Sequence, residues 1–398
     1  MLDALSATKY RILSHLPAVR RRQPAPPLVS VNNGCSSPPV RNRDAVVCDG
    51  IVCSRPTLPD PLERFALPPD VAQVLATLQR QHGKLLYDGF QLPPGTPQRA
   101  ALDGFCYKRA QLVDAALAAP ASATHPRDWP DLAPASNQAA LLRQVLGTTQ
   151  GLVIGEVHAD QGSKRLLIDH MPLLRHLGVD TLYLEHLQGD LHQADLDYLH
   201  RHGTCTGALE RFLAEQDQGH HTHAASGATF RNVVDAAFKA GVRVVALDLM
   251  ASYHLRGVTA PAGHAQETGL DLRTKLFNHV AAVRIEHDQR DQRGKPGPQR
   301  WVALVGNVHA GTFNGVTGIA ERLGVPSLRM EDTSPSWSGK IQVGCDPGRT
   351  AEPVAWRAGG ELQCDYLLKV PSKAGRARPD TPAPCTADEA RQSRQRRA

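Results

Sequence analysis

The sequence predicts an α/β protein in which a largely parallel sheet is flanked by helices on both faces. From residue 151 onward, short apolar segments such as GLVIG alternate with longer amphipathic segments. The apolar segments lack the polar and apolar alternation of half-exposed strands, so we expect both faces of each strand to be buried. Strands that alternate with helices along a chain usually form parallel sheets, because each connecting helix packs back onto the sheet.

A helical region is expected before the sheet, over residues 61–147. Its first helix is predicted at residues 68–83, where apolar residues recur at helical spacing after a proline and before a glycine. Two further helices are predicted at residues 107–119 and 136–147, the second with Ser136 as its N-cap. We expect this region to pack on the main domain.

The remaining elements follow the same alternation through residue 371. Strands are predicted at residues 151–155, 180–185, 242–248, 301–306 and 325–330, with an edge strand at 363–370. Helices are predicted at residues 163–178, 191–203, 228–241, 270–290 and 315–324. This order predicts one α/β domain over residues 148–371.

Both ends of the chain differ from this domain in composition. Residues 1–60 and 372–398 are rich in arginine, proline and serine and have little apolar periodicity, so we expect both to be disordered. The first segment resembles a type III secretion leader, and the second is a basic tail. Much of the net charge of +6 comes from these terminal arginines, so we expect no nucleic-acid partner.

The sequence also excludes several other classes of protein. No apolar run approaches the roughly 18 residues that span a bilayer, so no transmembrane segment is expected. The first residues lack the basic and apolar regions of a secretory signal peptide. The eight cysteines include no Cys-x-x-Cys pair, which argues against a zinc ribbon or a thioredoxin-type site.

Ionisable and polar residues follow four of the predicted strands. In chain order they are Glu156, His158, Glu185, His186, Asp248, Asn307 and His309. Ligands of parallel sheets bind beyond the carboxyl ends of the strands, where the loops meet. A glycine stands three residues before each of His158 and His309, and a glycine there permits a sharp turn. We therefore expect these side chains to share one pocket.

Imidazoles beside carboxylates suit two chemistries, and the residues alone do not choose between them. In the first, His158 and His309 act as general base and general acid, while Glu185 orients His158. In the second, His158, Glu185 and His309 bind a divalent metal that acidifies a bound water.

The carboxylates predict a cation among them. Glu156 and Asp248 are expected at the rim of the pocket, near Glu185. Crowded carboxylates raise one another's pKa unless a cation intervenes, so the arrangement needs either a metal or Arg273. Arg273 would then neutralise an oxyanion or a substrate carboxylate.

Other candidate residues have less support. No Gly-x-Ser-x-Gly segment occurs, so Ser163 and Ser252 are unsupported as nucleophiles and water is the expected one. The GHHTH segment at residues 219–223 is interpreted as a solvated loop. Five histidines in helical segments are interpreted as surface or packing residues: His170, His176, His192, His200 and His202.

The segments GEVH (155–158), YLEH (183–186) and GNVH (306–309) resemble those of a known superfamily. It comprises the Tiki and TraB proteases, the erythromycin esterase-like hydrolases and the ChaN-type haem-binding lipoproteins. These proteins share paired Gly-x-x-His turns and an acidic residue after an intervening strand. Glu156 matches the esterase-like and ChaN-like branches.

Residues 155–199 are similar to one branch in particular. It contains the domain found in Pasteurella multocida toxin, related membrane-targeted toxins and some type III effectors of plant pathogens. In that branch a helix before the second histidine turn carries an arginine and an asparagine, which Arg273 and Asn278 match. The resemblance covers residues 141–330. We expect substrate-binding residues at Asn278, Asn307 and His186.

The resemblance implies a type III secreted effector that acts in the host cytoplasm. Its expected activity is that of an esterase- or protease-like hydrolase, with a divalent metal as one option for its cofactor. The substrate would be a peptide, an ester or another small molecule, and host proteins are further candidate partners. Two alternatives use the same fold without turnover: a ligand- or haem-binding module, and a recognition scaffold.

Overall fold

The computed structural model describes residues 45–48, 51–54, 59–82, 90–119, 129–132, 137–222, 224–255, 258, 269–292, 299–333, 342–346, 354–355 and 360–371. The predicted disorder of residues 1–60 and 372–398 falls largely outside these ranges. Within the first 60 residues, β1 (Ala45–Cys48) pairs with β2 (Ile51–Ser54) in an antiparallel hairpin. Among the described residues, no helix is both long and apolar enough to cross a lipid bilayer.

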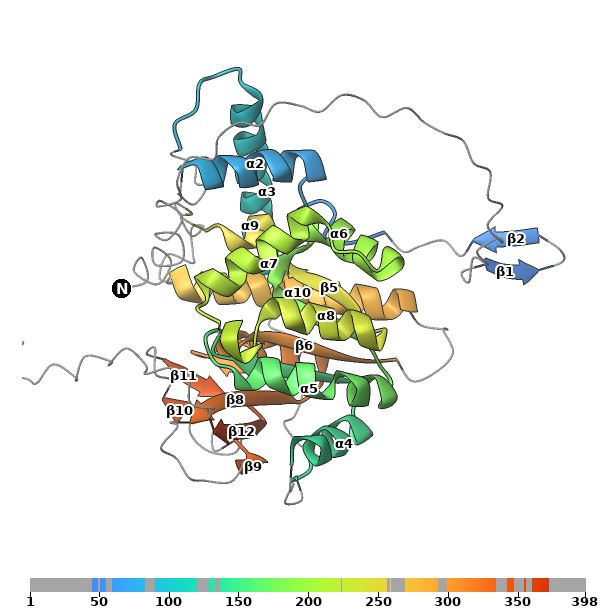
Figure 1. Ribbon diagram of the computed structural model, residues 1–398. Coiled ribbons are helices and arrows are strands. Elements are labelled where there is room, and N and C mark those ends of the chain that lie inside the picture. Colours follow the sequence, from blue (N-terminus) through green and yellow to red (C-terminus); the bar gives the residue numbers. More distant parts are fainter. Residues whose placement is uncertain are drawn as a thin grey trace, which may run out of the picture.

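A seven-stranded sheet forms the centre of the molecule, in the order β5-β4-β6-β3-β8-β12-β9 (Figure 1). Its strands are β3 (Gly151–Glu156), β4 (Val179–Gln188), β5 (Arg243–Asp248), β6 (Arg300–Gly306), β8 (Ser327–Thr333), β9 (Gln342–Cys345) and β12 (Tyr366–Pro371). All neighbouring pairs are parallel except β12 and β9. The predicted α/β class with a largely parallel sheet is confirmed.

Helices and short strands connect and cover the sheet. The helices are α2 (Pro69–His82), α3 (Pro97–Ala118), α4 (Gln138–Thr148), α5 (Gly162–His176), α6 (Gly189–His202), α7 (Gly207–Gly219), α8 (Phe230–Ala240), α9 (Met250–Tyr253), α10 (Gly269–Gln292), α11 (Asn307–Ala310) and α12 (Ile319–Leu323). A small three-stranded sheet contains β7 (Thr312–Phe313), β10 (Val354–Ala355) and β11 (Glu361–Gln363).

Three local expectations need correction. The segment at 363–370 is not an edge strand, because β12 lies between β8 and β9. The helix predicted at 315–324 is shorter, because its first residues form a turn after β7. The N-cap of α4 is Asn137, whose side chain accepts a hydrogen bond from the backbone N–H of Ala140, rather than Ser136.

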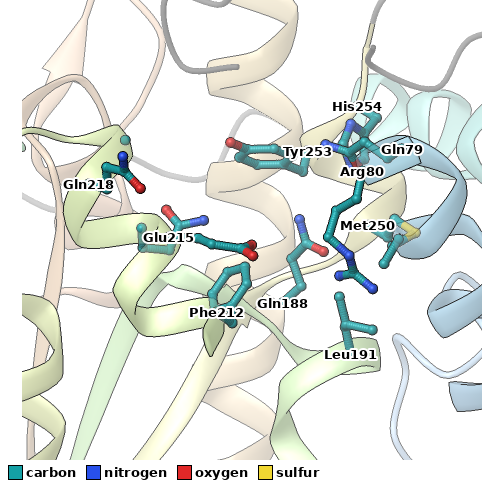
Figure 2. A pocket seen from close by; sticks show the side chains of 13 residues that line it. Gln79, Arg80, Gln188, Leu191, Phe212, Glu215, Gln218, Met250, Tyr253 and His254 are labelled. Atoms are coloured by element: carbon teal, nitrogen blue, oxygen red, sulfur yellow. The ribbon is translucent and has the colours of Figure 1, made fainter. Parts of the chain in front are cut away.

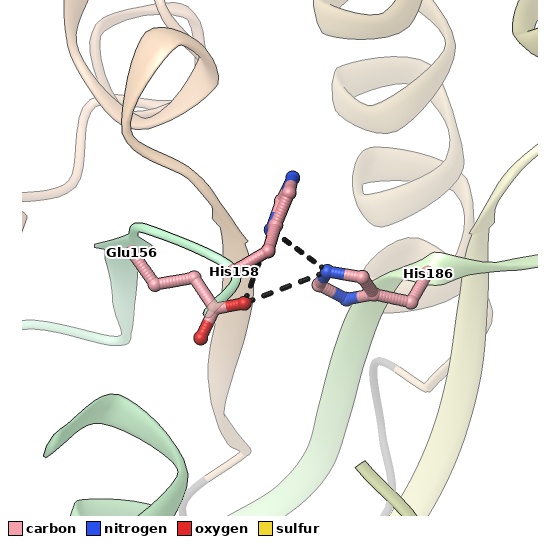
Figure 3. Close-up of side chains that lie close together, drawn as sticks. All are labelled: Glu156, His158 and His186. Carbon is pink, nitrogen blue, oxygen red and sulfur yellow. Dashed lines mark hydrogen bonds and ion pairs between the residues drawn. The ribbon is translucent and has the colours of Figure 1, made fainter. Parts of the chain in front are cut away.

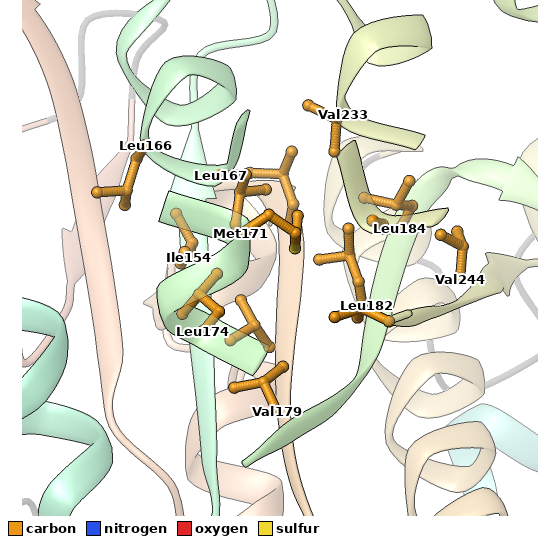
Figure 4. Packing of buried hydrophobic residues seen from close by; sticks show 14 of the residues in the cluster. Ile154, Leu166, Leu167, Met171, Leu174, Val179, Leu182, Leu184, Val233 and Val244 are labelled. Carbon is orange, nitrogen blue, oxygen red and sulfur yellow. The ribbon is translucent and has the colours of Figure 1, made fainter. Parts of the chain in front are cut away.

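Successive residues of each central strand point to opposite faces, and each face has its own apolar core. Ile154 contributes to the core under α5 and α8, together with Leu167 and Met171 of α5 (Figure 4). Val153 contributes to the opposite core, together with Phe277 of α10. This burial on both faces explains why the strand sequences are apolar throughout.

The helices α2 and α3 pack beside the carboxyl ends of β4 and β5. Their apolar residues form one core with Met250 of α9 and another with Leu276 of α10. The buried Arg109 of α3 donates a hydrogen bond to the backbone carbonyl of His254 at 3.0 Å. The helical region therefore forms part of the wall around the carboxyl ends of the strands.

Gly155 allows α11 to pack closely against β3. A Cβ atom at residue 155 would lie 2.5 Å from Oδ1 of Asn307 and 2.9 Å from Cβ of Ala310. Both distances are shorter than packed atoms tolerate. The glycine is therefore required by the close approach of the helical turn that carries His309.

We expect Gly155→Ala to destabilise the protein by about 1–3 kcal/mol, because α11 would have to move away from β3. Urea unfolding measures the change. The matched control is Gly147→Ala in α4, where an added Cβ meets no atom within 4 Å. Helix propensity predicts that this control is neutral or slightly stabilising. Equal stability of the two variants would contradict the close approach.

Candidate functional site

The predicted site residues gather at the carboxyl ends of four adjacent strands, β5, β4, β6 and β3. Parallel strands end on the same edge of a sheet, so residues far apart in sequence meet there. The pairing of β4 with β5 shifts register between Leu184 and Gln188. Such an irregularity changes the direction of consecutive side chains. It explains how both Glu185 and His186 reach the site, although neighbours in a regular strand face opposite ways.

Glu156, His158 and His186 form the first half of the site (Figure 3). Nδ1 of His158 lies 3.2 Å from Oε1 of Glu156 and 3.0 Å from Nε2 of His186. Nε2 of His186 is also 3.5 Å from the same carboxylate oxygen. Glu156 is 2% exposed, so it lies below the rim rather than on it.

Lys164 neutralises Glu156 from the other side. Its fully buried ammonium donates hydrogen bonds to Oε2 of Glu156 at 3.0 Å and to the backbone carbonyls of His158 at 2.7 Å and Asp160 at 3.0 Å. The hydroxyl of Ser163 donates to the same carboxylate oxygen. Glu156 is therefore an ionised and fixed carboxylate, with Oε1 directed at the two imidazoles.

Glu185, His309 and Arg273 form the second half of the site. Oε1 of Glu185 lies 3.5 Å from Nε2 of His309 and 3.8 Å from the Arg273 guanidinium. Oε2 accepts a hydrogen bond from the backbone N–H of Gly306 at 2.6 Å. Burial alone would raise the pKa of Glu185, but His309, His158, Arg273 and the Gly306 N–H lower it to about 2.

Gly306 joins the two halves. A Cβ atom at this residue would lie 3.2 Å from Cε1 and 3.5 Å from Nε2 of His158, and 3.5 Å from Oε2 of Glu185. The outer edge of the His158 ring therefore faces the Glu185 half, while its Nδ1 faces Glu156. The side chain of His158 is 33% exposed, so its ring is open to a substrate.

Asp248 binds Arg273 and fixes its direction. Oδ2 of Asp248 accepts from the guanidinium at 2.6 Å, and the Ser252 hydroxyl donates to Oδ1. Burial raises the pKa of Asp248, and Arg273 opposes that shift. Asp248 is 1% exposed, so its role is to hold Arg273 rather than to form the rim. Arg273 supplies the cation that the crowded carboxylates require.

Asn278 sets the protonation of His309. Its amide nitrogen donates to the carbonyl of Thr317 at 2.9 Å, so its oxygen faces Nδ1 of His309 at 2.8 Å. This network assigns the proton of the neutral ring to Nδ1. Burial lowers the pKa of His309 to about 4, against the opposing effect of Glu185. At neutral pH, Nε2 of His309 therefore carries a lone pair and has no proton to donate.

Two of the predicted substrate-binding residues are buried. Asn278 is fully buried behind His309, and Asn307 is 2% exposed and packs against Gly155. Their positions support the site and do not open into it. The third, His186, contacts His158 directly.

The GHHTH segment contributes one residue to the site, which corrects its interpretation as a solvated loop. His220 is 9% exposed, and its ring centre lies 4.7 Å from that of His158 and 5.2 Å from that of His186. His221 is exposed, and His223 lies outside the described residues. No spacing in the sequence distinguishes His220 from its neighbours. Among the helical histidines, His192 is buried against Phe212.

The metal candidates differ from those expected. Within the described residues, Glu156, His158 and His186 have ligand atoms within 4.8 Å of one another, whereas His158, Glu185 and His309 do not form such a group. The three donors suit a divalent ion in type and spacing. However, Lys164 already neutralises Glu156, which weakens the attraction of this group for a dication.

Comparison with solved structures found chains from bacterial toxins and effectors. RRSP, a MARTX toxin effector domain from Vibrio vulnificus CMCP6, is 21% identical, with a TM-score of 0.47 over 66% of this chain and 55% of that one. The C-terminal region of Pasteurella multocida toxin, reported to have a thiol-protease-like catalytic triad, is 13% identical, with a TM-score of 0.43 over 70% of this chain and 34% of that one. The type III effector HopBA1 is 13% identical, with a TM-score of 0.39 over 62% of this chain and 99% of that one.

The chain thus spans about half the length of the first of these structures and a third of the second. No family model and no curated protein matches the sequence.

We expect His309 to make the protein less stable in acid. Its folded pKa of about 4 lies below the ordinary value of 6.5, so its contribution is complete above pH 6.5 and is lost as the pH falls towards 4. The loss is at most about 3 kcal/mol. Urea unfolding between pH 7 and pH 4 measures it, and His309→Gln should show a shallower decline. An identical decline in both proteins would contradict the buried neutral imidazole.

Proposed function

We propose that this protein is a hydrolase that cleaves an ester or amide bond by attack of water, with His158 as the general base. The observation that carries the proposal is the Glu156–His158 pair. A buried, ionised carboxylate orients an imidazole whose other edge is open to a substrate. Lys164 holds Glu156 on the side away from His158, and Glu156 holds Nδ1 of His158. Nε2 is therefore the nitrogen of His158 that is left to exchange a proton with the substrate.

The proposed proton path begins with His158. With its Nδ1 proton directed at Glu156, its Nε2 accepts a proton from water as the water oxygen bonds to the substrate carbon. The resulting imidazolium, stabilised by Glu156, returns that proton to the leaving oxygen or nitrogen as the scissile bond breaks. Lys164 keeps Glu156 ionised throughout. This order of proton transfers uses no proton from His309, whose Nε2 carries none at neutral pH.

The second half of the site would stabilise charge. Arg273 is 17% exposed at its side chain and lies at the same strand ends as His158, so it can face a developing oxyanion. Neutral His309 would accept a hydrogen bond from the attacking water or from the substrate. A metal held by Glu156, His158 and His186 would also activate water, and the proposed path does not require it.

The family of the protein and its place of action are proposed from sequence segments. The meeting of GEVH, YLEH and GNVH at one sheet edge supports membership of the Tiki, TraB, erythromycin esterase-like and ChaN superfamily. We propose that the protein is a type III secreted effector that acts inside a host cell. The arginine, proline and serine content of residues 1–60 supports a leader that is exported unfolded.

We expect His158→Ala and Glu156→Gln each to lower kcat/KM by about 10²–10⁴-fold, because each removes the oriented base. A screen of chromogenic esters and fluorogenic peptides against the full chain provides the assay. His176→Ala, at an exposed position of α5, is the matched control and should keep full activity. Wild-type rates in a folded His158→Ala protein would exclude this assignment.

We expect residues 1–60 to direct export of a fused reporter through a type III apparatus. The reporter should appear in the medium of bacteria that possess the apparatus and stay inside an otherwise identical strain that lacks it. Immunoblotting of medium and cells measures the distribution. Retention in both strains would contradict the proposed leader.

A further inference from the structure

A cavity of about 90 Å³ lies between the helical region and the α/β domain (Figure 2). Its walls come from α2, α7 and α9 and from the junction of β4 with α6. The apolar part consists mainly of Leu191, Phe212, Met250 and Tyr253. A cavity of this size takes one side chain or a small molecule rather than a folded domain.

The cavity lies beside the proposed catalytic site. Gln188 on its wall follows His186 by two residues on β4. Gly219 on the opposite wall precedes His220, whose ring contacts that of His158. The ring of Tyr253 lies 5.6 Å from the Arg273 guanidinium. The cavity is therefore close enough to His158 for one part of an extended substrate to bind in it while another part lies at the proposed catalytic site.

Polar groups without partners face the cavity. Gln188 is 8% exposed, and its side-chain amide has no hydrogen-bond partner within the described residues. The half-buried carboxylate of Glu215 likewise has neither an ion pair nor a hydrogen bond in that part of the chain. Figure 2 shows both side chains directed into the space between the walls. Water can still reach both groups, and a ligand in the cavity that donates hydrogen bonds would replace that water.

The charge of the ligand follows from the positions of Glu215 and Arg80. Arg80 also lines the cavity, but it is exposed to solvent and donates a hydrogen bond to the Thr77 hydroxyl at 3.2 Å. Glu215 is the more buried of the two and has no such partner. The charge that lacks compensation is therefore negative, and a cation would satisfy it.

The walls suit a long basic side chain. Leu191 and Met250 can pack against an aliphatic stem, as lysine and arginine stems pack on apolar surfaces. The rings of Phe212 and Tyr253 also line the cavity, and aromatic rings attract cations. The side-chain amide of Gln188, which also lines the cavity, offers a further acceptor. A phosphate or carboxylate would find a carboxylate opposing it at the same place.

We infer that this cavity is a specificity subsite for the lysine or arginine side chain of a polypeptide substrate, with Glu215 as the residue that selects the positive charge. The inference rests on the proposed hydrolase function, because it makes the cavity a neighbour of the bond to be cleaved. The inference narrows the class of substrate from esters and amides in general to polypeptides with a basic residue near the scissile bond.

The test measures binding separately from turnover, in full-length protein carrying His158→Ala. The probes are N-acetyl-arginine amide, N-acetyl-glutamine amide and N-acetyl-glutamate amide, which differ mainly in the charge of the side chain. Isothermal titration or ligand-observed NMR gives their affinities. The arginine probe should bind at least about tenfold more tightly than the other two, as expected for a charge-assisted hydrogen bond.

Two substitutions in the same background identify the charge that matters. Glu215→Gln, which is nearly isosteric, should remove the preference for arginine, whereas Arg80→Gln should strengthen arginine binding by removing a like charge. Thermal unfolding checks that both variants fold. A preference that survives Glu215→Gln would overturn the inference. Tighter binding of the glutamate probe, lost in Arg80→Gln, would identify an anion site instead.

Weaker arginine binding in both variants would indicate a ligand with two opposite charges and would also overturn the inference. Failure of the proposed function gives a different result. Arginine would then still bind through Glu215, but wild-type protein would cleave no peptide that carries it. Cleavage of peptides regardless of basic residues would remove the subsite and leave the hydrolase in place.

Discussion

The contact between Lys164 and Glu156 is the interaction on which the site depends. A carboxylate that is fully removed from water is costly unless a cation and hydrogen bonds satisfy it. Lys164 does both, and it also donates hydrogen bonds to the carbonyls of His158 and Asp160, which stabilises the turn after β3. The aromatic ring of Phe230 lies 4.5 Å from the ammonium. One side chain thereby fixes the charge of Glu156 and the backbone position of His158.

The two halves of the site balance their charges in different ways. In the first half, Lys164 is enclosed and forms an ion pair with Glu156, whose other carboxylate oxygen faces two imidazoles. In the second half, Arg273 is shared between Asp248 and Glu185 and keeps some exposure to solvent. The enclosed cation suits a fixed orienting group, and the partly exposed cation suits contact with a substrate. The absence of a side chain at Gly306 lets the halves meet.

Sequence reasoning predicted the sheet and the edge at which the site lies, because apolar strands and the polar residues after them are local signals. It did not identify Lys164, since a lysine in the first turn of an amphipathic helix is normally solvent-exposed. It also placed Glu156 and Asp248 on the rim, although both are buried. Their partners come from elements distant in sequence, and such pairings leave no periodic pattern. His220 was missed for the same reason, because the packing of α7 and α8 determines its burial.

The apolar contacts of the helical region limit how the chain can be divided. Leu249, Leu272 and Leu276 belong to the α/β domain in sequence, but Leu62, Phe65 and Leu112 cover them. A fragment that began at β3 would present these leucines to water and would be prone to self-association. We therefore expect the boundary near residue 148, which the change of sequence pattern predicts, to separate two sequence patterns rather than two independently stable bodies. If the sheet domain were exchanged between proteins during evolution, the helices α2 and α3, or other apolar elements that cover the same leucines, would have to be exchanged with it.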